Sequence, residues 1–239
     1  MKRITAAQSL RPLLAVLFLA SLGAGLPSCA GSGGNLPAAA GDLERITLAP
    51  PDTQGGKPLM QALKERQSRR SFREDELAPE VLSNLLWAAF GVNRPDSGRR
   101  TAPSALNWQE IDVYVAMKRG LYLYNAGTHT LDPVLARDIR AETGGFIQPF
   151  VKKAPVNLVY VADLSRTRGL KGTVVSGEDK MLYAGVSTGC ISQNVYLYCA
   201  SQGLATVVRG YVDKAELAQA MGLREDQRVI LAQTVGYPK

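Results

Sequence analysis

Histidine is almost absent from this sequence of 239 residues, and cysteine is scarce. Because His129 is the only histidine, a metal site with several histidines is excluded, and a Ser/His/Asp triad would depend on this one residue. The three cysteines, at 29, 190 and 199, form no Cys-x-x-Cys pair. We expect Cys190 and Cys199 to lie on opposite faces of one helix, since nine residues at about 100° each turn them apart, and therefore not to form a disulfide.

Acidic residues are also missing from the first part of the chain. None precedes position 29, whereas Lys2, Arg3 and Arg11 do. Removing these three from the 28 basic residues leaves 25 against 21 acidic residues, a net charge of +4 instead of +7. The rest of the sequence has no basic tail or stripe, so we expect no nucleic-acid partner.

The N-terminal segment has the layout of a signal peptide. Its basic start is followed by an apolar run over 12–22, which is too short for a comfortable transmembrane helix. Small residues follow, and residues 26–29 read Leu-Pro-Ser-Cys, which resembles the lipobox of bacterial lipoproteins. We therefore predict a signal peptide over 1–29, lipidation of Cys29, and export to the periplasm or cell envelope. Plain secretion with cleavage near Ala24 or Ala30, or an uncleaved anchor, are the alternatives.

The remaining sequence divides into a tether and one domain. Residues 30–57 are rich in glycine, proline and alanine, which predicts a flexible tether and an extended lead-in. Over 58–239 the apolar spacing predicts helices and strands without regular alternation, so the fold class is α+β. The predicted helices span 59–67, 77–90, 132–141, 180–202 and 213–221, and the predicted strands span 111–117, 121–124, 156–162, 205–208 and 229–235. A long loop is predicted over 91–108.

Three polar motifs stand out in this domain. Arg66, Arg69, Arg70 and Arg73 surround Ser71, and forked guanidinium groups match the oxygens of a phosphate. Such a cluster is also found on solvated helix ends. Residues 103–109 read Pro-Ser-Ala-Leu-Asn-Trp-Gln, a loop of hydrogen-bonding groups that could instead be an ordinary turn. Residues 193 and 194 are a Gln-Asn pair in an apolar helix, where buried amides would need partners.

In this order, the motifs resemble the nitroreductase family. The resemblance covers about residues 57–239 and rests on Arg-Arg-Ser-x-Arg, on the Pro-Ser-x-x-Asn-x-Gln loop, on the Gln-Asn helix followed by Gly-Leu-x-x-Val, and on the final Val-Gly-Tyr-Pro. Leu-Leu-Trp-Ala-Ala-Phe-Gly over 85–91, with the loop after it, looks most like the branch that includes the azoline oxidases of peptide biosynthesis.

The resemblance implies a sandwich of a mixed, mainly antiparallel sheet flanked by helices, in an intertwined homodimer with non-covalent FMN at the subunit interface. Carried over by motif, the cofactor contacts fall in three groups. The phosphate and ribityl chain would be held by Arg69, Arg70, Ser71, Arg73 and Lys239. The partner subunit would supply Pro103, Ser104, Ala105 and Asn107. The ring would lie along Val208, Arg209 and Gly210. Many members have an acidic or small residue at the position of Arg209.

An FMN site would need no catalytic side chain, because the cofactor carries the chemistry. Hydride would enter and leave at flavin N5 in a ping-pong cycle, with a small nitro compound, quinone or other conjugated substrate. A cation, from Lys152, Lys153 or Arg209, would stabilise the reduced flavin. For an exported protein the donor could be NAD(P)H, a membrane quinol or a redox protein. The alternatives are an azoline-type peptide dehydrogenase and a non-catalytic lipoprotein that binds a ligand on the same fold.

Overall fold

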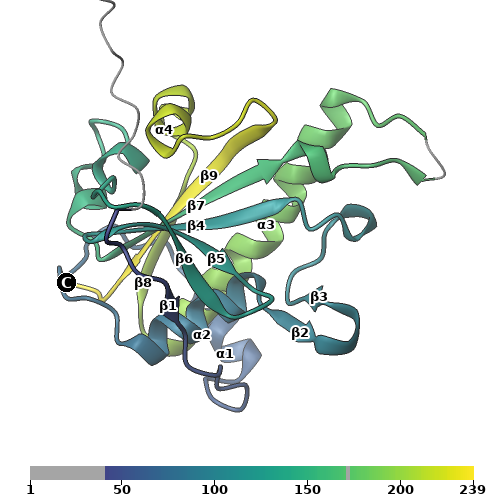
Figure 1. Cartoon of the computed structure of the whole chain (residues 1–239). Helices are drawn as coiled ribbons and strands as arrows, with labels where there is room; N and C mark the ends of the chain where they lie inside the picture. Colours follow the sequence, from purple (N-terminus) through teal and green to yellow (C-terminus); the bar gives the residue numbers. More distant parts are fainter. Residues whose placement is uncertain (1–40, 171–172) are drawn as a thin grey trace, which may run out of the picture. The chain divides into compact units, whose positions relative to one another are not determined.

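The computed structural model describes residues 41–170 and 173–239, and Figure 1 shows their arrangement. The predicted signal peptide, Cys29 and residues 30–40 of the predicted tether and lead-in lie outside the described residues. A seven-stranded sheet forms the centre, and each pair of neighbouring strands in it is antiparallel. In spatial order the strands are β1 (Ile46–Thr47), β6 (Thr130–Leu135), β5 (Gly120–Asn125), β4 (Ile111–Met117), β7 (Val156–Asp163), β9 (Gln227–Gly236) and β8 (Ala205–Arg209).

Helices cover both faces of the sheet. On one face, Leu85 of α2 (Pro79–Phe90) and Ile191 of α3 (Gly177–Gln202) share a core with Leu158 of β7. The other face is covered by α4 (Lys214–Met221), whose buried Leu217 packs with Val159. Neighbouring residues of a strand point to opposite faces, and both faces are covered, so β7 is buried throughout and is mostly apolar, with Asn157 as the polar exception before its last residue. The short α1 (Leu59–Glu65) contacts α3.

Helix α3 is the longest element and runs behind the sheet in the view of Figure 1. It begins where the Ser176 side chain accepts a hydrogen bond from the backbone nitrogen of Asp179 at 3.0 Å. It ends at Gly203, whose φ of 70° lies in the left-handed region that glycine adopts without a steric penalty. Its 26 residues correspond to about 39 Å. Among the described residues, no helix has the length and apolar character needed to cross a membrane.

Most predicted elements are present, but two segments differ from the prediction. The prediction of a helix over 132–141 is wrong, because residues 130–135 form the strand β6 beside β5. Pro133 lies opposite Tyr122 at a shift in the register, where a residue without an N–H group is tolerated. The loop predicted over 91–108 contains a hairpin of β2 (Val92–Arg94) and β3 (Arg99–Arg100). Short 3-10 turns are η1 (Pro95–Ser97), η2 (Ala105–Asn107), η3 (Ala141–Thr143), η4 (Pro149–Lys152) and η5 (Leu164–Arg166).

Candidate FMN site

The arginine-rich segment over 66–73 lies between the edge strand β8 and the last residues of the chain. The Arg69 backbone nitrogen donates to the Thr206 carbonyl at 2.9 Å, and that of Arg73 donates to the Tyr237 carbonyl at 2.9 Å. Phe72, which is buried, forms an isolated β-bridge with Pro238. Main-chain hydrogen bonds therefore bring three segments that are far apart in the sequence to one edge of the sheet.

Basic side chains from these segments surround two cavities, each of about 500 Å³. One lies beside Tyr196 and Thr206, and its charged lining residues are Lys57, Lys64, Arg66 and Arg69 together with Glu65. The other lies beside Phe72, and its charged lining residues are Arg73, Lys153 and Lys239 together with Glu74 and Asp75. We call Arg66, Arg69, Arg70, Arg73, Lys153 and Lys239 the basic cradle; Arg70 lines neither cavity but follows Arg69 in the chain.

Most of the cradle's positive charge is available to a ligand. Only Arg73 among its six members has a carboxylate within 4.0 Å in the part of the chain that the structure describes, namely Asp75 at 2.7 Å. The Arg66 guanidinium lies 5.2 Å from the centre of the Tyr196 ring, and that of Arg73 lies 5.7 Å from the Tyr237 ring, which holds both in place by cation–π contact. Ser71 is exposed, and its carbonyl accepts from the Lys239 backbone nitrogen at 3.4 Å. The arrangement suits an anionic phosphate.

The end of β8 lies next to this cradle. The Val208 backbone nitrogen donates to the Tyr196 hydroxyl at 2.9 Å, and Gly210, the residue after the strand, is exposed. The Arg209 side chain is different, since only 4% of the residue's surface is accessible. The Gln233 amide donates both to the Thr206 hydroxyl of β8 and to the Ser192 carbonyl of α3, so the Thr206 side chain points to the face that α3 covers. Because side chains alternate along a strand, Arg209, three residues later, points to the opposite face.

The loop predicted to face the flavin is not brought to the cradle within one chain. Its Ser104 hydroxyl accepts from the Gln109 backbone nitrogen at 3.0 Å, and the backbone of Asn107 is left-handed with φ of 55°. The adjacent Trp108 packs edge-to-face on Tyr183 of α3 at 5.8 Å, whereas the cradle contacts Tyr196. Thirteen residues of helix separate these two tyrosines, about 20 Å. Pro103, Ser104, Ala105 and Asn107 therefore lie far along α3 from Arg69.

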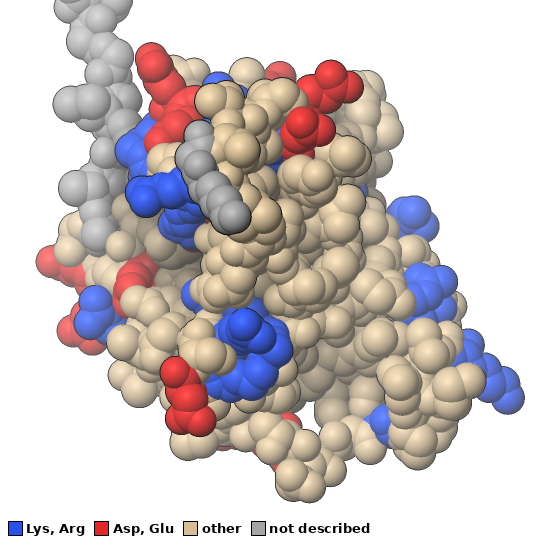
Figure 2. All heavy atoms as spheres, turned by 90° about the vertical axis from the view of Figure 1, so that its right-hand side faces the viewer, with Lys and Arg blue, Asp and Glu red and all other residues tan. Residues whose placement is uncertain are grey.

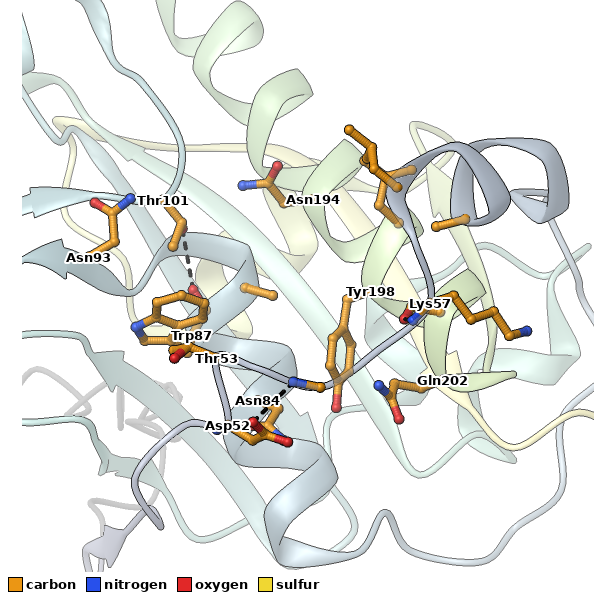
Figure 3. Close-up of a pocket in the computed structure, with 16 residues that line it drawn as sticks. Asp52, Thr53, Lys57, Asn84, Trp87, Asn93, Thr101, Asn194, Tyr198 and Gln202 are labelled. Carbon is orange, nitrogen blue, oxygen red and sulfur yellow. Dashed lines mark hydrogen bonds between the residues drawn. The ribbon is translucent and has the colours of Figure 1, made fainter.

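A third cavity, of about 450 Å³, separates the lead-in segment from α2 and α3 and was not predicted from the sequence. Figure 3 shows its labelled side chains, which include the Trp87 and Tyr198 rings and the amides of Asn84, Asn194 and Gln202. Its walls are closed by the bond from the Asp52 nitrogen to Asn84 at 2.8 Å. The one signal for this cavity in the sequence was the Gln-Asn pair over 193–194, and of these two residues Asn194 lines the cavity. No residue predicted to contact FMN lines this cavity.

The single histidine has a structural environment. The Tyr124 hydroxyl lies 2.9 Å from Nδ1 of His129, while Nε2 lies 2.8 Å from the Ser83 hydroxyl and 3.1 Å from the Ala49 carbonyl. Because Ser83 already donates to Ala49, these contacts place the proton on Nε2. The histidine thus joins the lead-in segment, α2 and the β5–β6 turn, and burial lowers its pKa.

Comparisons with known proteins find relatives of this chain. The Nitroreductase family profile matches residues 63–237. The crystal structure of a Ralstonia eutropha protein described as a nitroreductase is 43% identical, covers 86% of this chain and 96% of that chain, and has a TM-score of 0.77. The FMN reductase [NAD(P)H] of Bacillus subtilis is 23% identical over 75% of this chain and 66% of its own length. The Escherichia coli microcin synthetase complex McbBCD, with 18% identity and a TM-score of 0.62 over 83% of this chain and 79% of that chain, shares the fold.

Proposed function

Because the chain belongs to the nitroreductase family, we propose that it is an FMN-dependent oxidoreductase whose cofactor lies between the basic cradle and the end of β8. The observation that carries this proposal is the cradle itself. Its arginines and lysines come from three segments, and five of the six have no carboxylate partner among the described residues. A phosphate monoester carries one to two negative charges at neutral pH, and guanidinium groups bind its oxygens in a forked geometry.

In this site Arg69, Arg70, Ser71, Arg73 and Lys239 hold the phosphate and ribityl chain. The main chain at Val208–Gly210 orients the ring, since the Val208 nitrogen is fixed by Tyr196, and Gly210, which is exposed, has no side chain to block a close approach. When bound, FMN supplies hydride transfer at N5 to or from a small conjugated substrate such as a nitro compound or quinone. The protein's share of the work is binding, orientation and electrostatics.

A second copy of the chain completes the site. Leu182 and Val186 on α3 are 59% and 57% exposed, and nothing lies within 4 Å of a Cβ placed at Gly185 or Gly189. Figure 2, which views the right-hand side of Figure 1, shows broad uncharged areas between separate groups of basic side chains. Two α3 helices crossing antiparallel at Gly189 would bring the partner's 103–107 loop opposite residue 195 of this chain, about 18 Å along α3 and close to the cradle.

The physiological setting is part of the proposal. We expect export to the cell envelope with a lipid anchor at Cys29, on the signal-peptide layout of residues 1–29. Outside the cytoplasm NAD(P)H is not expected, so a quinol or a redox protein becomes the donor. A peptide dehydrogenase of the azoline type is the second candidate, supported by the shared fold of a subunit in the microcin synthetase complex.

The first test is an absorbance spectrum of the full-length chain after incubation with FMN and desalting. Retained flavin absorbance supports the proposal and justifies screening NAD(P)H and quinols as donors, and nitroarenes against azoline peptides as substrates. A folded chain that returns colourless would overturn the enzyme proposal and leave the fold to a ligand-binding role.

A further inference from the structure

Arg209 is a buried cation without a counter-ion. Its guanidinium donates to five acceptor atoms, and all five are neutral: the carbonyl and hydroxyl of Thr143, and side-chain oxygens of Gln148 (3.2 Å), Asn157 (3.2 Å) and Thr234 (3.0 Å). Within residues 41–170 and 173–239, no carboxylate oxygen lies within 4.0 Å of it.

Arg140 shows the usual arrangement for comparison. It is 9% exposed, and its guanidinium is paired with the Asp138 carboxylate at 2.8 Å. A buried charge is unfavourable unless an opposite charge compensates it, and proteins normally provide one. Burial lowers the pKa of Arg209 to about 10, so the side chain is still charged at neutral pH. The fold thus keeps a bare positive charge in a fixed position.

The charge lies behind the end of β8, on the face of the sheet opposite α3, and the main chain of β8 in front of it is proposed to face the ring. Lys152 and Lys153, the other candidate cations, are exposed, so water and salt screen them. Arg209 also fixes the 143–148 loop through Thr143 and Gln148. A charge that is both desolvated and rigid acts over a longer range than an exposed lysine.

We infer that Arg209 has no counter-ion among the described residues because its charge is reserved for reduced FMN, which it stabilises and whose reduction potential it raises. The inference rests on the proposed FMN site. A hydride from an organic donor, two electrons and one proton, converts the neutral oxidised ring into a reduced ring with one net negative charge. A cation nearby favours the second state over the first. Arg209 would act on the ring by electrostatics, as a positioning and tuning residue.

The sharpest test supplies the missing counter-ion and leaves Arg209 in place. Gln148→Glu is nearly isosteric and puts a carboxylate where the amide oxygen now accepts from Arg209. The Gln148 amide nitrogen has no hydrogen-bond partner among the described residues, so none of the bonds seen is lost. The matched control is Gln219→Glu on the exposed side of α4, which adds the same charge on the same face of the sheet but at a residue that makes no hydrogen bond to Arg209 among those the structure describes. The midpoint potential of bound FMN is measured in the full-length chain.

We expect Q148E to weaken the preference for reduced over oxidised FMN about tenfold, a fall of about 30 mV for a two-electron couple. Q219E should match the wild type. The midpoint potential of Arg209→Lys should stay near that of the wild type, and that of Arg209→Gln should fall as it does in Q148E. The second pair of variants tests the inference even if Q148E folds poorly. The FMN-free Q148E chain should melt no lower than the wild type, because the buried guanidinium gains a partner.

Two results would count against the inference, and they differ. If the wild type retains FMN but the midpoint potentials of Q148E and R209Q equal that of the wild type, Arg209 does not tune the flavin, and the proposed function still stands. The same conclusion follows if Q219E shifts the potential as much as Q148E. If the wild type retains no flavin absorbance, the proposed function fails and takes this inference with it.

Discussion

Replacing Arg69 with glutamine removes one guanidinium from the basic cradle and keeps the main-chain bond from residue 69 to Thr206. A hydrogen bond to a charged group contributes about 1.5–3 kcal/mol, and Arg69 is exposed, so we take the lower end. At about 1.4 kcal/mol for each factor of ten, the dissociation constant for FMN should rise about tenfold at low salt. Titration of the chain into FMN, followed by flavin fluorescence, measures this constant.

The matched control for Arg69→Gln is Lys214→Gln, which removes the same charge from exposed α4 on the other face of the sheet. It should bind FMN as the wild type does. Because the cradle binds an anion with exposed cations, the difference between R69Q and the wild type should shrink as salt rises from 50 mM to 500 mM, a range chosen to shorten the screening length. Equal constants for R69Q and the wild type at low salt, or an equal loss in K214Q, would refute the assignment of the cradle to the phosphate.

Three further perturbations test the interface, the histidine and the core. Val186→Glu places a charge on the exposed stripe of α3, so light scattering after gel filtration should show a monomer with weakened FMN binding; an unchanged dimer rejects the proposed crossing. Burial lowers the pKa of His129, so the unfolded chain takes up a proton first, and the free energy of unfolding should fall as pH drops below about 6.5 and level off below the folded pKa. Urea unfolding at pH 7.5 and 5.5 measures this fall, which His129→Gln should reduce. Leu158→Ala in the fully buried β7 should cost about 2–5 kcal/mol in the same assay, and a cost below 1 kcal/mol contradicts its place in the core.

The sequence was sufficient for elements whose signals are local. The helix predicted over 213–221 is α4, which Asp213 caps and the left-handed Gly222 ends, and the strand predicted over 156–162 is β7. The segment after Asp132 failed, because Asp-Pro also begins helices and the pairing of residues 130–135 with β5 is a long-range contact. The free cysteines follow the prediction, since neither Cys190 nor Cys199 is in a disulfide.

For the proposed site, the sequence predicted the residues but not their spatial relation. The Arg-Arg-Ser-x-Arg motif and Lys239 were predicted as one phosphate site, and the main-chain bonds of residues 69–73 to β8 and the C-terminal segment do bring them together. The 103–107 loop lies at the other end of α3, and no local pattern encodes that distance. The cavity around Trp87 was missed because its wall comes from four parts of the chain, the lead-in with α1, α2, the hairpin region and α3, and of these only the Gln-Asn pair on α3 gave a signal in the sequence.

Arg209 shows why the direction of a side chain matters as much as its position. The motif placed it on the ring, yet the alternation of β8 turns its side chain to the face away from α3, where Thr143, Asn157 and Thr234 hold it. Its main chain can therefore contact the flavin while its charge acts from behind the strand. Exposed cradle cations and a buried cation differ in their response to salt, because ions in solution screen the first and not the second. In the proposed site the exposed cradle cations bind FMN, and the buried Arg209 tunes its potential. The affinity for FMN should therefore depend on salt, whereas the difference in midpoint potential between the wild type and R209Q should not.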